Sequence, residues 1–248
     1  MLNKKQLEKY YEDGYVIPDF QMAEKELLEI EKLHDQLIKK YPKYLNYCPA
    51  ILQYEESFLK YCLNEKILNL VEQLIGKDFA LWNSSFFAKP ALNGHATPWH
   101  QDGQYWPIRP LATCTVWLAI DDANVENGCL RLIPGTHKSR IDLHRHLVNA
   151  HEGGGYDIKE TNEWMFCDHP QAIDLHVKAG QLVIGDARLL HATHPNRSTE
   201  RRTVLLGWYY RKSNEAPEWW RGTIPNEIRR RDKNEPNVWD RTPGKYLR

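Results

Sequence analysis

Two histidines and one aspartate have the residue types and the spacing of a metal site. His100 and Asp102 are separated by a single residue, and His191 lies far downstream. Two imidazoles and one carboxylate can occupy one face of an octahedral Fe(II) ion and leave three positions for an organic cosubstrate and O₂. This donor set is typical of an oxygenase, whereas a structural metal site closes every position around its ion.

The donors must come from different parts of the fold, because a facial arrangement needs ligands that converge from different directions. Alternate side chains of a strand point to the same side, so we expect His100 and Asp102 to face inward and the residue between them to face away. The apolar segment 180–190 predicts a strand that leads to His191. His194 is the alternative distal ligand, but it lies in a turn-forming segment, and we favour His191.

Arg202 begins a segment, 202–210, whose β-branched and aromatic residues predict a strand. A strand, a turn and a returning strand would bring Arg202 beside His191. A guanidinium binds a carboxylate through two parallel hydrogen bonds, as the distal carboxylate of 2-oxoglutarate would require, and the Thr193 hydroxyl could assist. Arg201 is the alternative to Arg202; strand alternation lets only one of them point inward, and we favour Arg202.

The residues around these positions form separated motifs at 99–110, 116–122, 126–138 and 189–193, the last followed by Arg202. With the opening segment 13–18, they resemble the phytanoyl-CoA dioxygenase family of Fe(II)- and 2-oxoglutarate-dependent oxygenases over nearly the whole chain. The resemblance implies a double-stranded β-helix core. It also implies iron on His100, Asp102 and His191, 2-oxoglutarate on Arg202 and Thr193, and an approach of Trp117 to the cosubstrate.

One position discriminates within that family. Halogenating members replace the metal-binding carboxylate with a small residue, which frees a position for chloride, whereas this chain keeps Asp102. The resemblance therefore favours a hydroxylase over a halogenase. The chain has Ala192 and Thr193 after the distal histidine where the familiar pattern is Gly-Ser, a change that preserves the hydroxyl. We see no targeting presequence, and we therefore do not expect the peroxisomal acyl-CoA role that names the family.

Composition excludes several other classes of protein. The chain has 248 residues with 33 basic and 33 acidic side chains, so its net charge gives no general attraction to nucleic acid or to membranes. Its five cysteines contain no Cys-x-x-Cys pair, which favours a reducing compartment over a disulfide framework. No segment approaches the roughly 20 apolar residues of a membrane span. We expect a cytoplasmic protein that acts on a small molecule.

The pattern of apolar residues predicts a mainly β fold with flanking helices and a double-stranded β-helix (jelly roll, cupin-like) core in one domain, 1–248. We expect a mostly helical brace over 1–78, the core over 79–211 and a C-terminal extension over 212–248. Helices are predicted at 4–12, 22–41 and 57–75. Strands are predicted at 16–18, 79–89, 113–120, 129–133, 175–184 and 203–210.

The long, glycine-containing segment 144–170 is either a lid over the site or a solvated surface loop. Its histidines, His144, His146 and His151, are too irregularly spaced to favour a second metal. The C-terminal stretch 219–233 is basic and carries aromatic residues, but interspersed acidic residues favour a tail that wraps the barrel or meets another subunit over a nucleic-acid site.

Aromatic residues that follow the ligand segment are candidates for the substrate pocket, namely Tyr105 and Trp106, with Gln101 between the two ligands. Lys89 or Arg109 could bind an acidic substrate, although isolated charges of this kind are usually solvated or paired at the surface.

The sequence thus predicts a dioxygenase that uses Fe(II), 2-oxoglutarate and O₂ to hydroxylate, or otherwise oxidise, a small polar metabolite, with release of succinate and CO₂. Two alternatives remain open. A cupin-like hydrolase or isomerase could hold Zn or Mn on the same ligands and would not need Arg202. A non-catalytic binding barrel would consume no O₂.

Overall fold

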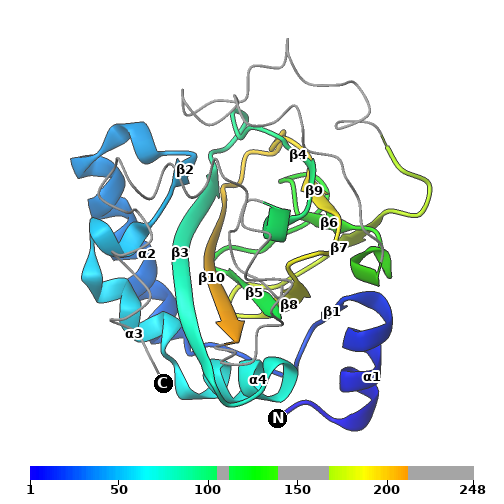
Figure 1. Cartoon of the computed structure of the whole chain (residues 1–248). Coiled ribbons are helices and arrows are strands. Elements are labelled where there is room, and N and C mark those ends of the chain that lie inside the picture. The colour runs from blue at the N-terminus through cyan, green and yellow to red at the C-terminus, as the bar shows by residue number, and fades with distance from the viewer. Residues whose placement is uncertain (105–111, 139–167, 212–248) are drawn as a thin grey trace, which may run out of the picture.

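The computed structural model describes residues 1–104, 112–138 and 168–211. Their strands form two antiparallel sheets, one with the order β1-β8-β5-β10-β3-β2 and the other with the order β4-β9-β6-β7 (Figure 1). The strands are β1 (Tyr15–Val16), β2 (Tyr47–Cys48), β3 (Phe79–Lys89), β4 (Thr97–His100), β5 (Thr113–Ala119), β6 (Leu130–Leu132), β7 (Ile173–Leu175), β8 (Leu182–Asp186), β9 (His191–Thr193) and β10 (Arg202–Arg211). The predicted mainly β, jelly-roll fold is confirmed.

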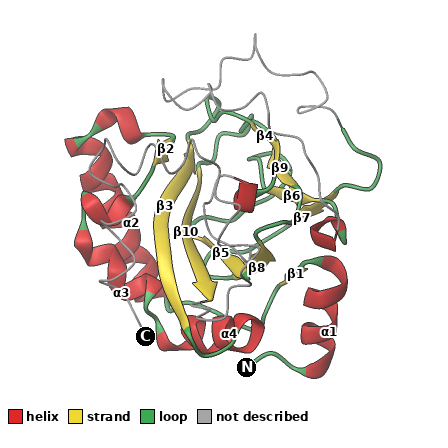
Figure 2. Ribbon diagram, in the orientation of Figure 1, coloured by secondary structure: helices red, strands yellow, loops and turns green. Residues whose placement is uncertain are grey.

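Helices cover one side of the larger sheet, with α1 at its β1 edge (Figure 2). They are α1 (Lys4–Asp13), α2 (Glu24–Lys40), α3 (Leu59–Cys62) and α4 (Glu65–Ile75), together with the 3₁₀ helices η1 (Pro42–Tyr44), η2 (Ile51–Gln53), η3 (Glu56–Phe58), η4 (Asp102–Gln104) and η5 (Thr136–Lys138). In the part of the chain that the structure describes, no helix is both long and apolar enough to cross a membrane.

The core has two layers because successive residues of a strand face opposite sides of the sheet. On β10, Leu205 and Tyr209 pack in the layer between the larger sheet and the helices, which includes Ile30 of α2 and Val71 of α4. Leu206 and its alternate neighbours on β10 pack instead in the layer between the two sheets. The four cysteines that the structure describes are buried and free of disulfides.

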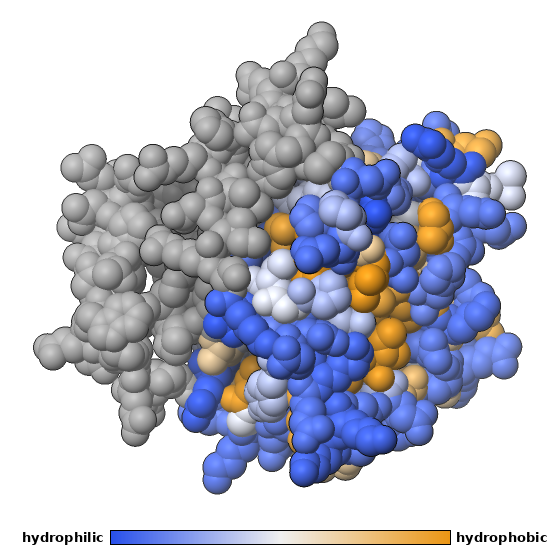
Figure 3. Space-filling model, turned by 90° about the vertical axis from the view of Figure 1, so that its right-hand side faces the viewer, coloured by the Kyte–Doolittle hydropathy of each residue, from blue (hydrophilic) through white to orange (hydrophobic). Residues whose placement is uncertain are grey.

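The surface differs in character from this apolar core. Figure 3 views the side of the molecule at the right of Figure 1, and hydrophilic side chains predominate on the described part of this face. Hydrophobic residues appear there as small patches between them. A few large apolar side chains are exposed, such as Leu92 and Leu28, as is normal for a folded protein.

Two predicted elements are each interrupted in the structure. The helix expected over 57–75 is divided into α3 and α4, because the Asn64 side chain accepts a hydrogen bond from the Lys66 backbone N–H and starts a new helix. The strand expected over 175–184 is divided into β7 and β8 by a turn that contains Gly180, whose φ of +83° is readily adopted only by glycine.

A third prediction was wrong about connectivity. We expected a strand, a turn and a returning strand between His191 and Arg202. Instead β9 belongs to the smaller sheet and β10 to the larger one, so the chain crosses between sheets after Thr193. The chain also crosses between Asp186 and His191, where the strand predicted from the apolar segment ends. As a result, His191 and Thr193 lie on the smaller sheet, and Arg202 lies on the larger one.

Gly14 joins α1 to β1 and lies against the barrel. Its φ is +86°, and a Cβ at this position would lie 2.5 Å from His137 Nδ1 and 2.9 Å from Leu189 Cδ1. Gly135 has a similar φ, +81°, but a Cβ there would meet nothing closer than 3.8 Å. The two glycines therefore share a backbone requirement, and only Gly14 has a packing requirement as well.

Replacing each glycine by alanine should separate these two effects. Gly135→Ala should lower the free energy of unfolding by about 1 to 2 kcal/mol, the cost of a left-handed alanine. Gly14→Ala should cost about 1 to 3 kcal/mol more, because the added methyl group overpacks the site. Urea unfolding followed by circular dichroism measures both values, and equal losses would contradict the close packing around Gly14.

Candidate metal centre

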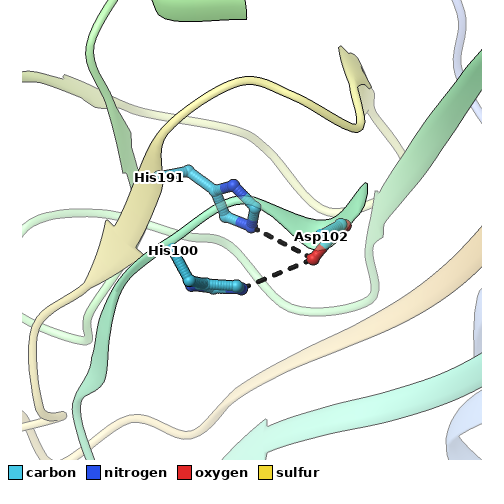
Figure 4. A group of neighbouring side chains, drawn as sticks. All are labelled: His100, Asp102 and His191. Carbon is cyan, nitrogen blue, oxygen red and sulfur yellow. Dashed lines mark ion pairs between the residues drawn. The ribbon is translucent and has the colours of Figure 1, made fainter. Parts of the chain in front are cut away.

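His100 and His191 are brought together by the pairing of two short strands. His100 is the last residue of β4, His191 is the first residue of β9, and the two are direct partners in the antiparallel register. Their ring centroids lie 4.2 Å apart. Asp102 follows from η4, and Figure 4 shows the three side chains pointing toward one another. Asp102 therefore lies outside the strand, and the prediction that it shares one extended strand with His100 was wrong.

The donor atoms of these residues converge. Asp102 Oδ1 lies 3.4 Å from His100 Nε2 and 3.6 Å from His191 Nε2. The three ligand atoms all lie within 4.8 Å of one another, and among the described residues they form a group that could hold a metal ion. Two nitrogen donors and one carboxylate oxygen suit a first-row divalent ion such as Fe(II).

The outer nitrogen of each ring fixes which nitrogen faces the site. His100 Nδ1 lies 2.8 Å from the Pro98 carbonyl oxygen, and His191 Nδ1 lies 2.9 Å from the Leu189 carbonyl oxygen. A carbonyl oxygen only accepts hydrogen bonds, so each Nδ1 carries a proton and Nε2 is the ring nitrogen that faces the site. This arrangement is typical of metal-binding histidines. The residues present therefore fit the metal that the donor set implies.

The charge state of the site also suits a cation. Burial lowers the pKa of His191 to about 4, with a further lowering from neighbouring His100, so its imidazole is neutral at pH 7. Burial acts to raise the pKa of Asp102, but the adjacent histidines and the Trp208 hydrogen bond outweigh it and hold that pKa well below the usual range. At neutral pH the site thus offers one carboxylate and neutral His191 to a divalent cation.

The second oxygen of Asp102 has its own partners. Oδ2 accepts hydrogen bonds from Thr115 Oγ1 at 2.8 Å and from Trp208 Nε1 at 2.9 Å. Neither Thr115 nor Trp208 was predicted to contact the site. No local motif signals them, because they meet only through the pairing of β5 with β10, in which Thr115 and Trp208 are register partners.

Arg202 lines the same cavity as His100, Asp102 and His191, and it has few hydrogen-bond partners there. Its side chain is 1% exposed, its Nη1 donates to the Phe87 carbonyl oxygen at 3.3 Å, and its Nε has no hydrogen-bond partner among the described residues. Its Cζ lies 5.7 Å from the centre of the Trp117 ring. Burial lowers the pKa of Arg202 to about 9, still above neutral pH. A buried guanidinium without a carboxylate partner is costly, and a bound anion would relieve that cost.

A cavity of about 70 Å³ connects the metal-facing residues with Arg202. Thr193 lines it, and the Thr193 hydroxyl accepts a hydrogen bond from the Thr97 backbone N–H at 3.2 Å. The remaining walls are largely apolar and come from both sheets and the segments beside them, including Tyr15, Trp117, Leu130, Leu132, Leu189 and Leu206. An apolar wall of this kind limits the access of water to the metal-facing atoms.

The alternatives to the favoured residues have other partners. Arg201 forms ion pairs with Glu31, Asp35 and Asp121 at 3.1 to 3.3 Å, which attach α2 to the barrel. His194 Nε2 lies against Arg131 and 3.5 Å from Asp168 Oδ1, in a separate group of charges. The structure therefore brings Arg202 and His191, and not these two, into the cavity.

The remaining predicted residues divide into two groups. Gln101 is buried, its side-chain amide donates to the Arg188 carbonyl oxygen, and it is not among the residues that line the cavity. Lys89 is buried too and donates to the His95 carbonyl oxygen, so the expectation of a surface lysine was wrong. Outside the described residues lie Tyr105, Trp106, Arg109, His144, His146, His151, most of the segment 144–170 and the C-terminal extension 212–248.

Comparison with known proteins identifies the family. The model of the phytanoyl-CoA dioxygenase (PhyH) family matches residues 10–204, and the chain belongs to this family. A phytanoyl-CoA dioxygenase domain-containing protein 1 homolog of Caenorhabditis elegans is 29% identical over 151 residues, 60% of this chain and 52% of that protein. A probable alpha-ketoglutarate-dependent hypophosphite dioxygenase of Stutzerimonas stutzeri is 30% identical over 148 residues, 59% of this chain and 50% of that protein. The chain thus spans about half the length of these relatives.

Solved structures share the fold at lower sequence identity. The non-heme alpha ketoglutarate dependent carbocyclase SnoK from nogalamycin biosynthesis has a TM-score of 0.68 at 22% identity, with 89% of this chain and 91% of that chain covered. EvdO2 of Micromonospora carbonacea var. aurantiaca, solved with 2-oxoglutarate, has a TM-score of 0.68 at 19% identity, with 89% and 97% covered. These two likenesses show that the chain shares the fold of both proteins.

Proposed function

We propose that this protein is a non-haem Fe(II)- and 2-oxoglutarate-dependent oxygenase. The observation that carries the proposal is that one cavity is lined by the converging donors His100, Asp102 and His191 and by the Arg202 guanidinium. Neither the metal triad nor the buried arginine alone would identify an oxygenase, because each occurs in proteins for other reasons. Together they match a cosubstrate that chelates a metal at one end and carries a carboxylate at the other.

Each residue of the cavity has a defined task in this proposal. His100 Nε2, His191 Nε2 and Asp102 Oδ1 would hold Fe(II). Bound Fe(II) supplies the activation of O₂, which is coupled to conversion of 2-oxoglutarate into succinate and CO₂. Arg202 and the Thr193 hydroxyl bind the distal carboxylate of 2-oxoglutarate, which sets the direction of its keto-acid end. The Trp117 ring packs beside Arg202, and the apolar walls exclude water from the reacting groups.

Hydroxylation of a small polar metabolite is the outcome that we favour. Asp102 takes the position that a chloride ion would need, which argues against halogenation. The relative from Stutzerimonas stutzeri is named for hypophosphite, a small polar anion, and this supports a substrate of similar size. The carbocyclase among the structural neighbours shows that this fold also serves other oxidations, so a hydroxylated product is the specific claim to test.

The two other candidate functions account less well for Arg202. A hydrolase or isomerase that uses its metal as a Lewis acid would need the triad alone, and it would release no succinate. A non-catalytic barrel would need no metal-facing donors. The buried guanidinium beside the triad therefore favours the oxygenase.

A succinate assay tests the proposal. Fe(II)-loaded protein is incubated in air with 2-oxoglutarate and a panel of small polar metabolites, and succinate and oxidised products are followed by mass spectrometry. We expect O₂-dependent succinate that at least one metabolite stimulates. His191→Ala should abolish it, whereas His194→Ala should keep it. Metal-dependent turnover of a metabolite without succinate would contradict an oxygenase and favour the Lewis-acid alternative.

The role of Arg202 can be separated from that of its neighbour. Arg202→Lys keeps a positive charge but loses the two parallel N–H donors, so the KM for 2-oxoglutarate should rise about tenfold or more. Arg201→Lys is the matched control, because Arg201 pairs with carboxylates outside the cavity, and its KM should stay within about twofold. Steady-state succinate formation measures both values. An unchanged KM in Arg202→Lys would remove this residue from the cosubstrate site.

A further inference from the structure

The two oxygens of the Asp102 carboxylate have different surroundings. Oδ1 faces His100 Nε2 and His191 Nε2 at 3.4 Å and 3.6 Å. Oδ2 accepts one hydrogen bond from the Thr115 hydroxyl at 2.8 Å and another from the Trp208 indole N–H at 2.9 Å. One oxygen is thus directed at the site of the metal, while the other is held by two donors from the protein.

These two donors come from the larger sheet, whereas Asp102 follows a strand of the smaller one. Thr115 on β5 and Trp208 on β10 are register partners, and their side chains reach the same oxygen. Trp208 is buried, at 7% exposed, within the layer between the sheets. Asp102 begins η4 and lies outside the strands of both sheets. Its side chain is therefore oriented mainly by contacts from across the barrel.

The orientation matters because a carboxylate can bind a metal ion through one oxygen or through both. Binding through both oxygens would take a fourth coordination position. The proposed chemistry needs three free positions, two for 2-oxoglutarate and one for O₂. Donors that occupy Oδ2 make its rotation onto the metal costly, because the hydroxyl and the indole N–H would then be left buried without an acceptor.

We propose that Thr115 and Trp208 are positioning residues that keep Asp102 a one-oxygen ligand and so preserve the open face of the metal. This inference rests on the proposed function, since it concerns the same site. A merely structural role would predict something different: the variants would lose stability, but the metal affinity and the number of free positions would not change.

The chain offers close controls for both residues. Thr113 lies two residues before Thr115 on β5, is buried, and its hydroxyl has no hydrogen-bond partner among the described residues. Thr113→Val therefore makes the same chemical change as Thr115→Val without removing a bond to Asp102. Thr115→Ser restores the hydroxyl. Trp82 packs against the same core layer as Trp208, so Trp82→Phe is the control for Trp208→Phe.

The first measurement is the affinity of the apoprotein for Fe(II), by anaerobic titration. Removing a hydrogen-bond partner of a metal ligand typically weakens metal binding by roughly tenfold to a hundredfold. We expect a loss of that size in Thr115→Val and in Trp208→Phe. The affinities of Thr115→Ser, Thr113→Val and Trp82→Phe should stay within about threefold of the wild-type value. Circular dichroism and the thermal midpoint of each apoprotein establish that the compared variants are folded.

The second measurement counts the free positions. Nitric oxide binds Fe(II) in place of O₂ and gives a characteristic electron paramagnetic resonance signal. In the presence of saturating 2-oxoglutarate, the wild-type protein should give this signal at full intensity. Thr115→Val and Trp208→Phe, loaded with Fe(II) to the same level, should give a signal at least about twofold weaker, because Oδ2 competes for the remaining position.

The outcomes distinguish this inference from the function on which it rests. A wild-type protein that binds no Fe(II) would contradict the proposed function itself. A wild-type protein that binds Fe(II), with unchanged affinity and signal in Thr115→Val, would overturn the positioning role and leave the function intact. If Trp208→Phe does not fold, the comparison of Thr115→Val with Thr115→Ser and Thr113→Val decides the question.

Discussion

The pairing of β4 with β9 is the constraint on which the site depends. It sets His100 directly opposite His191, so two imidazoles meet although their residues lie far apart in the sequence. The pairing has an irregularity between Thr97 and His100, but a slip of one residue at His100 would turn its imidazole away from His191. The geometry of the two nitrogen donors is therefore a property of the sheet, and it does not depend on loop conformation.

The second sheet contributes the charge and the support that the first one lacks. From β10 and β5 come the buried Arg202 guanidinium and the two donors that hold Asp102. Both are buried charges: the guanidinium has few hydrogen-bond partners, whereas the carboxylate is kept charged by the adjacent histidines and the Trp208 hydrogen bond. A metal ion and an acidic cosubstrate would compensate both, and this explains why a protein would retain such groups in its interior.

Much of the site could be predicted from the sequence, because a metal triad and a carboxylate-binding arginine leave recognisable spacings. Strand alternation predicted that only one of Arg201 and Arg202 points inward, and the family resemblance favoured Arg202. The route of the chain could not be predicted: nothing local shows that β9 and β10 enter different sheets, or that Asp102 leaves the strand of His100. Thr115 and Trp208 were missed for the same reason, since their contact with Asp102 exists only once both sheets are assembled.

The most direct test of the account is an anaerobic titration of the Fe(II)-loaded protein with 2-oxoglutarate, followed by visible absorption. Chelation of the metal by the keto-acid end should produce a charge-transfer band that saturates at one equivalent of 2-oxoglutarate. Arg202→Lys should need a higher concentration to reach the same band. A wild-type protein that binds Fe(II) tightly but develops no band at saturating 2-oxoglutarate would contradict the central claim that the triad and Arg202 form one site.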